Sequence, residues 1–147
     1  MSLADRILED LKTALRAKDE TTKRTLRMLK SDLGRLEVEL GRDLTEDDEL
    51  KVLAGAVKSR RDSIAAYEEA ERNDLADAER DEIAVLERYL PAQLDEAAAR
   101  DAIAKLAAEL GITQKKQMGQ LMKAVMEKLR GQVDGKVASR IAGELLS

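Results

Sequence analysis

The sequence predicts an all-α protein, and three observations support this fold class. The 147 residues are rich in Ala, Leu, Glu, Lys and Arg, which favour helices, and Pro91 is the only proline. Apolar residues recur with helical spacing along most of the chain, and no segment alternates as a strand does. Hydrophobic residues make up 44% of the chain but aromatic residues only 1%, so we expect an aliphatic core.

Residues 1–90 are predicted to form an N-terminal domain of four helices. These helices run from Ser2 through a leucine-rich stripe to Leu15, from Thr21 or Thr22 to Gly41, from Thr45 to about Tyr67, and from about Asp74 to Leu90. Ser2 and Thr45 are suitable N-caps, and Gly41 is a suitable C-cap. The acidic run at 46–49 lies where the helix dipole favours anions. Pro91 cannot continue the fourth helix.

Residues 91–147 are predicted to form a second, smaller domain of three helices. They run from Asp95 to Gly111, from about Gln114 to Arg130, and through Val137, Ile141 and Leu145 after a turn between Gly131 and Gly135. The charge distribution supports this boundary. Residues 36–90 hold seventeen acidic and eight basic residues, whereas residues 111–147 hold three acidic and seven basic residues. A basic end after an acidic middle suggests a polyanionic partner, although short segments also fluctuate in charge.

Missing residue types exclude several kinds of chemistry. The chain has no cysteine and no histidine, which rules out disulfides, thiolate metal sites and cysteine nucleophiles and removes the commonest general base. No phosphate-binding loop, nucleophile elbow or HExxH motif is present. We therefore expect a non-catalytic protein without a cofactor or metal. The lack of cysteine, of a signal peptide and of a membrane-spanning run leads us to expect a cytoplasmic protein without a membrane partner.

Lysines and glycines near the C-terminus are the best indication of function. On a helical wheel, Lys116, Lys123 and Arg130 recur every seven residues and form a strip beside the methionine-rich apolar face. Gly119 lies between this strip and that face. A phosphate backbone can lie along such a row of cations, because the bare glycine permits close approach. Lys136, at the start of the last helix, adds a cation near backbone N–H groups.

Several of these residues also have a purely structural interpretation. The methionines are expected to be core residues, and Gly131 and Gly135 serve either the turn or a binding surface. Asp134 is better explained as an N-cap than as a catalytic acid. The acidic run at 46–49 suits a helix start better than a metal site, because it lacks the ligand spacing of a calcium loop. Arg60 lies on an apolar stripe, so it is either a rim residue or half of a buried ion pair.

Four blocks of sequence resemble the GatB/YqeY-like family, small helical proteins similar to the C-terminal tail of the B subunit of the tRNA-dependent glutamine amidotransferase. Together with the opening helix pair, their order covers nearly the whole chain. Two positions depart from the family pattern. The family often has lysine where this chain has Gln120, and glycine where it has Lys123. The four blocks are Lys58–Tyr67 with Ala70, Arg72, Asp74 and Leu75; Tyr89–Leu94; Met118–Met126; and Gly131–Lys136.

The resemblance implies a two-part helical fold that contacts tRNA through its C-terminal segment. We therefore expect a non-catalytic module that binds tRNA or another structured RNA. The positive charges that contact the RNA would come from Lys116, Lys123, Arg130, Lys136 and Arg140. The RNA would approach the protein closely at Gly119, Gly131 and Gly135. The first alternative is an adaptor that docks to amidotransferase or synthetase proteins. The second is an accessory to a carbon–nitrogen ligase with glutamine as amido donor.

Overall fold

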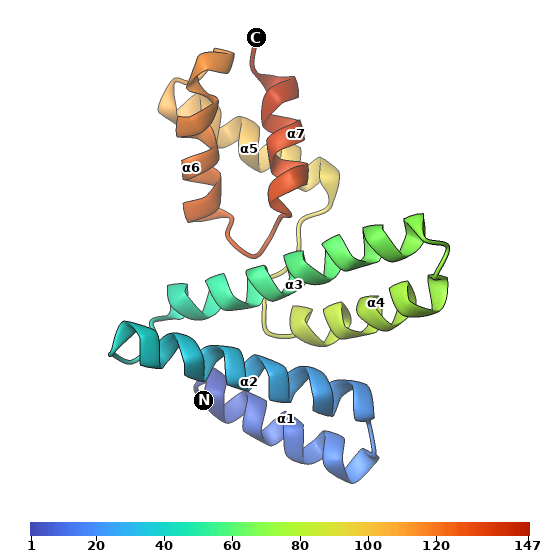
Figure 1. The fold of residues 1–147 in the computed structure, drawn as a ribbon. Helices are drawn as coiled ribbons and strands as arrows, with labels where there is room; N and C mark the ends of the chain where they lie inside the picture. The colour runs from blue at the N-terminus through green and yellow to red at the C-terminus, as the bar shows by residue number, and fades with distance from the viewer. The chain divides into compact units, whose positions relative to one another are not determined.

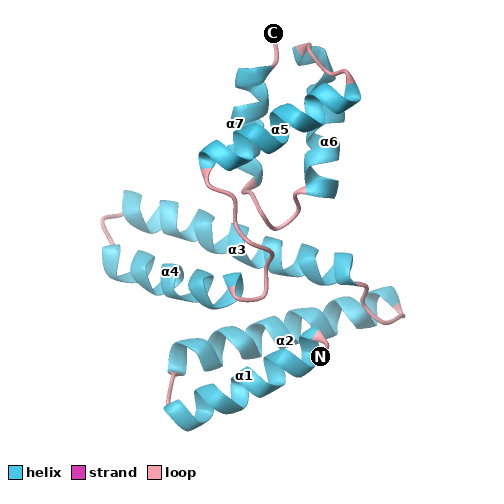
Figure 2. Ribbon diagram, turned by 180° about the vertical axis from the view of Figure 1, so that it is seen from behind, coloured by secondary structure: helices cyan, strands magenta, loops and turns pink.

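The computed structural model describes residues 1–147, which form seven α-helices and one short 3-10 helix without any strand (Figures 1 and 2). The predicted all-α class is confirmed. The chain divides into two compact units, residues 1–90 and residues 91–147. Each unit has its own cluster of buried aliphatic side chains.

The first unit contains α1 (Leu3–Ala17), α2 (Glu20–Leu40), α3 (Glu46–Glu69) and α4 (Asn73–Glu87). α1 packs on α2 and α3 packs on α4, while α2 also contacts both α3 and α4. Helical spacing brings one apolar stripe of each helix to a shared core. Its fully buried large side chains are Ile7, Leu26, Leu29, Leu53 and Leu86.

Helix starts in this unit follow the expected chemistry with one correction. The Ser2 side chain accepts a hydrogen bond from the Asp5 backbone at 3.1 Å, as an N-cap does. α2, however, begins at Glu20 and not at Thr21 or Thr22, because Asp19 is its N-cap. An Asp19 carboxylate oxygen accepts from the Thr22 backbone at 3.1 Å. Hydrogen bonds from the Thr22 hydroxyl and backbone hold the pKa of Asp19 below its ordinary value.

The acidic run at 46–49 belongs to the start of α3. The Thr45 hydroxyl accepts from the Asp48 backbone, and the Asp48 carboxylate accepts from the Thr45 backbone at 2.9 Å, which completes a capping box. Arg42 donates to the same carboxylate at 2.7 Å. These contacts hold the pKa of Asp48 far below its ordinary value, the Arg42 hydrogen bond contributing most. The preceding Gly41 adopts the left-handed conformation, φ 66°, that ends α2.

A buried ion pair links α3 to α4. Arg60 is 8% exposed and Glu82 is 7% exposed, and Arg60 Nε lies 3.3 Å from a Glu82 carboxylate oxygen. Arg24 of α2 reaches the other oxygen of Glu82, also at 3.3 Å. Of the two interpretations of Arg60, the buried ion pair is therefore correct. Glu82 joins three helices through two cations.

The second unit contains α5 (Glu96–Leu110), the 3-10 helix η1 (Lys115–Gln117), α6 (Met118–Lys128) and α7 (Gly135–Leu145). The single helix predicted from Gln114 to Arg130 is thus divided. The Gln117 side chain accepts from the backbone N–H groups of Thr113 and Gln114 at 3.1 and 3.2 Å, which holds the tighter turn before α6. The core between the helices is aliphatic. Its fully buried members are Ala99, Ile103, Leu121, Val125, Ala138, Ile141 and Ala142.

Candidate nucleic-acid interface

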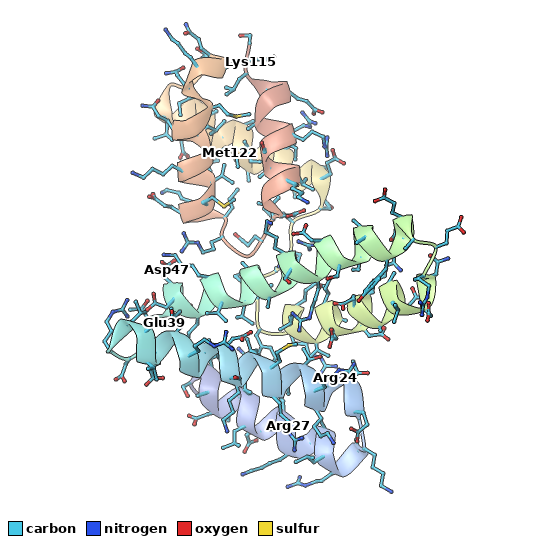
Figure 3. All side chains as sticks on the ribbon, viewed as in Figure 1. Arg24, Arg27, Glu39, Asp47, Lys115 and Met122 are labelled. Atoms are coloured by element: carbon cyan, nitrogen blue, oxygen red, sulfur yellow. The ribbon has the colours of Figure 1, made fainter.

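The methionines of α6 pack toward α7, where two glycines make room for them. A Cβ atom built at Gly143 lies 3.5 Å from Met118 Cε, and one built at Gly135 lies 3.9 Å from Met126 Cε. The start of α6 therefore lies beside the end of α7. Met122 lies between these contacts on the side of α6 that faces α7 (Figure 3). All three methionines are half-buried against the core, which confirms that they are core residues.

Two of the predicted cations are exposed beside this methionine row. Lys116 of η1 and Lys123 of α6 are both exposed, and neither forms an ion pair. Gly119 lies between them in the sequence and is also exposed, and a Cβ there would meet nothing within 4 Å. Arg130 differs, because it is half-buried and its Nε donates to the Met126 carbonyl at 3.1 Å. Of the predicted strip, Lys116 and Lys123 are thus exposed on either side of Gly119 in the sequence. Arg130 instead bonds back to the end of α6.

The turn between α6 and α7 depends on Gly131. Its φ of 78° lies in the left-handed region that favours glycine. The Gly131 carbonyl accepts a hydrogen bond from the Gln93 side chain, and the Gln132 carbonyl accepts from the Leu94 backbone at 2.8 Å. These bonds fasten the turn to the segment that precedes α5. Gly131 therefore has a structural role, and its contact with RNA stays a prediction.

The start of α7 carries the next two predicted residues. Gly135 is the first residue of the helix, and Lys136 is exposed in its first turn. Asp134 occupies the N-cap position with an extended backbone, and its carbonyl accepts from the Ala138 backbone at 2.9 Å. Its carboxylate, however, makes no capping hydrogen bond to the helix. The predicted N-cap position of Asp134 is therefore confirmed, but its side chain does not make the capping hydrogen bond.

Arg140 is a predicted RNA-binding cation whose charge is balanced by two carboxylates. Its guanidinium pairs with Glu96 of α5 and with Glu144 of α7, the latter at 3.2 Å. These contacts raise the pKa of Arg140, the Glu96 hydrogen bond contributing most. Arg100 also pairs with Glu144, and hydrogen bonds from Arg100 and Arg140 lower the pKa of that carboxyl. Any RNA contact by Arg140 would have to compete with two carboxylates.

Cations at two places in the second unit differ in whether acids pair with them. Those between α5 and α7, Arg100 and Arg140, are paired with acids. Those along η1 and α6 are not, and the sequence prediction omitted two of them, because Lys115 (Figure 3) and Lys128 are also exposed without an ion pair. Because Lys115 directly precedes the predicted Lys116, the pair of adjacent lysines in the sequence could have indicated it. The unpaired lysines of η1 and α6 are the part of this unit best able to meet an anion.

The basic residues at 58–61 of α3 do not form a comparable site. Lys58 pairs with Asp62 at 3.3 Å, Arg61 approaches Glu87 at 3.8 Å, and Arg60 is buried. No group of three or more acidic side chains is placed to hold a metal ion. None of the helices combines the length and the apolar character that crossing a bilayer requires.

Comparison with known proteins identifies the family. The family described as Yqey-like protein matches residues 4–146. The chain belongs to this family. The match covers nearly the whole chain and supports the YqeY part of the resemblance seen in the sequence. The similarity to the amidotransferase tail rests on the sequence blocks alone.

Three curated relatives share the name "Altered inheritance of mitochondria protein 41, mitochondrial". The protein of Kluyveromyces lactis is 38% identical over 82 residues, which is 55% of this chain and 44% of the relative. That of Clavispora lusitaniae is 37% identical over 90 residues, 59% of this chain and 52% of the relative. That of Lachancea thermotolerans is 35% identical over 83 residues, 56% of this chain and 44% of the relative. The chain thus spans about half the length of these relatives.

The names of the relatives contradict the expected cytoplasmic location. All three are mitochondrial proteins by name, so the sequence-based prediction is wrong on this finding. The prediction depended largely on the lack of cysteine. Cysteine content reports on redox chemistry, and it does not distinguish one reducing compartment from another.

Proposed function

We propose that this member of the Yqey-like family is a non-catalytic RNA-binding module. It holds tRNA, or another structured RNA, along the exposed lysines of η1 and α6. The observation that carries the proposal is the division of cations in the second unit. Lys116 and Lys123 are exposed without acid partners. Arg100 and Arg140, in contrast, both form ion pairs with Glu144.

The proposed contacts are to phosphate and not to bases. Both tyrosines of the chain lie in the first unit, so the second unit has no aromatic ring on which a base can stack. Lysines contact phosphates as point charges, and they fix the position of an RNA without reading its sequence. Gly119 supports close approach, because its surroundings are open where a side chain would otherwise stand. Recognition is then by backbone and shape, as is common for structured RNA.

The choice of tRNA comes from the resemblance to the amidotransferase tail. Under this proposal the chain holds tRNA beside an enzyme that forms a carbon–nitrogen bond, and it contributes no catalytic residue itself. An accessory role in glutamine-dependent amide transfer follows only if such an enzyme is present. Amide transfer to mischarged tRNA, measured with and without the chain, tests that narrower claim.

Charge removal at the lysines tests the proposal directly. Labelled tRNA is titrated with the full chain, with the variant Lys116→Gln/Lys123→Gln, and with the control Lys105→Gln. Lys105 is also exposed and unpaired, but it lies on α5. We expect the double variant to bind about ten-fold or more weakly, because each phosphate contact adds to affinity, and the control to bind as the unmodified chain does. Equal binding by all three proteins contradicts the proposal.

A protein–protein adaptor is the second candidate, and exposed apolar residues of the first unit favour it. Val38 is 81% exposed and Leu40 is 42% exposed at the end of α2. The half-buried methionines of α6 do not favour it, because they already pack against the core. Capture of amidotransferase or synthetase proteins from nuclease-treated lysate distinguishes the candidates. An adaptor retains its protein partner after RNA is digested, and Val38→Asp then removes it.

A further inference from the structure

One flank of α1 packs against the rest of the first unit, and the other does not. The Arg6 guanidinium donates to the Arg88 carbonyl at 3.2 Å, and the Tyr89 hydroxyl donates to Asp10. These contacts fix the flank of α1 that faces the end of α4. Otherwise α2 is the only helix against which α1 packs along its length. The remaining flank of α1 carries exposed side chains.

Apolar residues line this exposed flank. Leu8 is 43% exposed and Leu15 is 47% exposed. Leu11 lies between them at the edge of the flank, half-buried because it also packs against the core of the unit. With the exposed Ala4 these residues have spacings of four, three and four, the spacing of a seam that packs against another helix. At about 100° per residue they share one side of α1. The buried Ile7 and Ala14 of α1 lie to one side of this line.

A charged line runs beside the apolar seam. Asp5, Glu9, Lys12 and Arg16 each follow a seam residue directly, so they have the same spacing. All four are exposed, and none forms an ion pair within the chain. Most other helices pair such charges, as Lys58 and Asp62 do on α3. Along this charged line the order is two acids followed by two bases.

We propose that a second copy of this chain docks antiparallel along the Leu8–Leu15 seam. A two-fold axis through the middle of α1 exchanges Leu8 with Leu11 and brings the seams together. The same axis brings Asp5 near Arg16 of the second copy and Glu9 near Lys12, each pair offset by two residues or about 3 Å along the helix. Each copy therefore supplies the charges that the other lacks, which a closed two-fold interface requires. The two α1–α2 hairpins then form a four-helix arrangement across the axis.

The order of charges selects this occupant over others. A parallel second copy would set Asp5 against Asp5 and Lys12 against Lys12, which repel. An acidic partner helix would meet the bases at one end but also the acids at the other. An antiparallel copy satisfies both ends at once. Leu8 and Leu15 supply the apolar area, and the charges supply orientation.

Sedimentation equilibrium of the full chain tests this dimer. We expect self-association that strengthens with protein concentration. The variant Leu8→Asp/Leu15→Asp should weaken association by roughly 100-fold, because two leucines per copy lose their apolar contact. The control Leu110→Asp changes a side chain that is 55% exposed on the second unit, and it should leave the dimer intact. A chain that stays monomeric at high concentration, or two variants that dimerise equally, overturns the proposal.

Charge variants provide a second test that does not alter the seam. Lys12→Glu/Arg16→Glu makes the charged line wholly acidic, and Asp5→Lys/Glu9→Lys makes it wholly basic. Each variant alone should be monomeric, and an equal mixture should form a heterodimer that high salt weakens. Circular dichroism confirms that both variants remain helical. A mixture that stays monomeric while the unmodified chain dimerises shows that another surface is used, and it contradicts the proposed interface.

Discussion

Glu82→Gln is the substitution whose cost follows most directly from the structure. Glu82 and Arg60 are both more than nine-tenths buried, and their charged atoms lie 3.3 Å apart. Glutamine keeps the size of the side chain but not its charge, so Arg60 loses its ion pair and only the charge of the neighbouring Glu79 still acts on it. Breaking a buried pair in this way costs about 3–5 kcal/mol. The contact of Glu82 with Arg24 adds less than about 1 kcal/mol, because the Arg24 side chain is 58% exposed.

Urea denaturation followed by tyrosine fluorescence measures this cost. Both tyrosines, Tyr67 and Tyr89, lie in the first unit, so their signal reports the unfolding of that unit alone. We expect Glu82→Gln to lower the free energy of unfolding by about 3 kcal/mol or more. The double variant Arg60→Met/Glu82→Leu removes both charges and should recover most of the loss. A loss below about 1 kcal/mol for Glu82→Gln, or a double variant as unstable as the single one, refutes the reasoning.

Four further predictions concern a cap, two glycines and a carboxylate with a raised pKa. Asp48→Asn should destabilise the first unit at neutral pH, because the ion pair with Arg42 is lost. Because Arg42 lowers the pKa of Asp48 in the folded state, this difference should shrink as the pH falls below the ordinary value of 3.8; a pH-independent difference is the contrary result in urea titrations. Gly131→Ala should cost about 1–2 kcal/mol, because its φ is positive. Gly119→Ala should gain up to about 1 kcal/mol within α6 and weaken tRNA binding; thermal melts that rank the two glycine variants the other way contradict this. Burial and the charge of Glu82 raise the pKa of Glu79, so Glu79→Gln should stabilise the protein at pH 7. That gain should vanish below the ordinary value of 4.5, and a gain that persists in acid points to a cause other than ionisation.

Features set by local sequence were predictable. The all-α class, the left-handed C-caps at Gly41 and Gly111 and the capping role of Thr45 depend on neighbouring residues only. The start of α2 was misplaced because Asp19 and Thr22 are both good caps, and the choice depends on which side chain the fold buries. Thr22 is buried at 4% exposure and donates its hydroxyl to Asp19 at 2.6 Å.

Features set by tertiary contacts were not predictable. The wheel placed Arg130 in a row with the lysines, but the residue lies beyond the end of α6 and bonds to a helix carbonyl. Arg140 was chosen for its charge, and nothing in the sequence indicated that Glu96, 44 residues away, would pair with it. Gly143 was overlooked because its partner, Met118, lies on another helix.

The salt dependence of tRNA binding tests the central claim most directly. If lysines of η1 and α6 bind phosphates, the logarithm of the association constant should fall linearly with the logarithm of salt concentration, with a slope of roughly −2 for two or three contacts. Lys116→Gln/Lys123→Gln should make that slope shallower by roughly one to two, and Lys105→Gln should leave it unchanged. Affinity that ignores salt, or the absence of binding at tens of micromolar protein, would contradict the account.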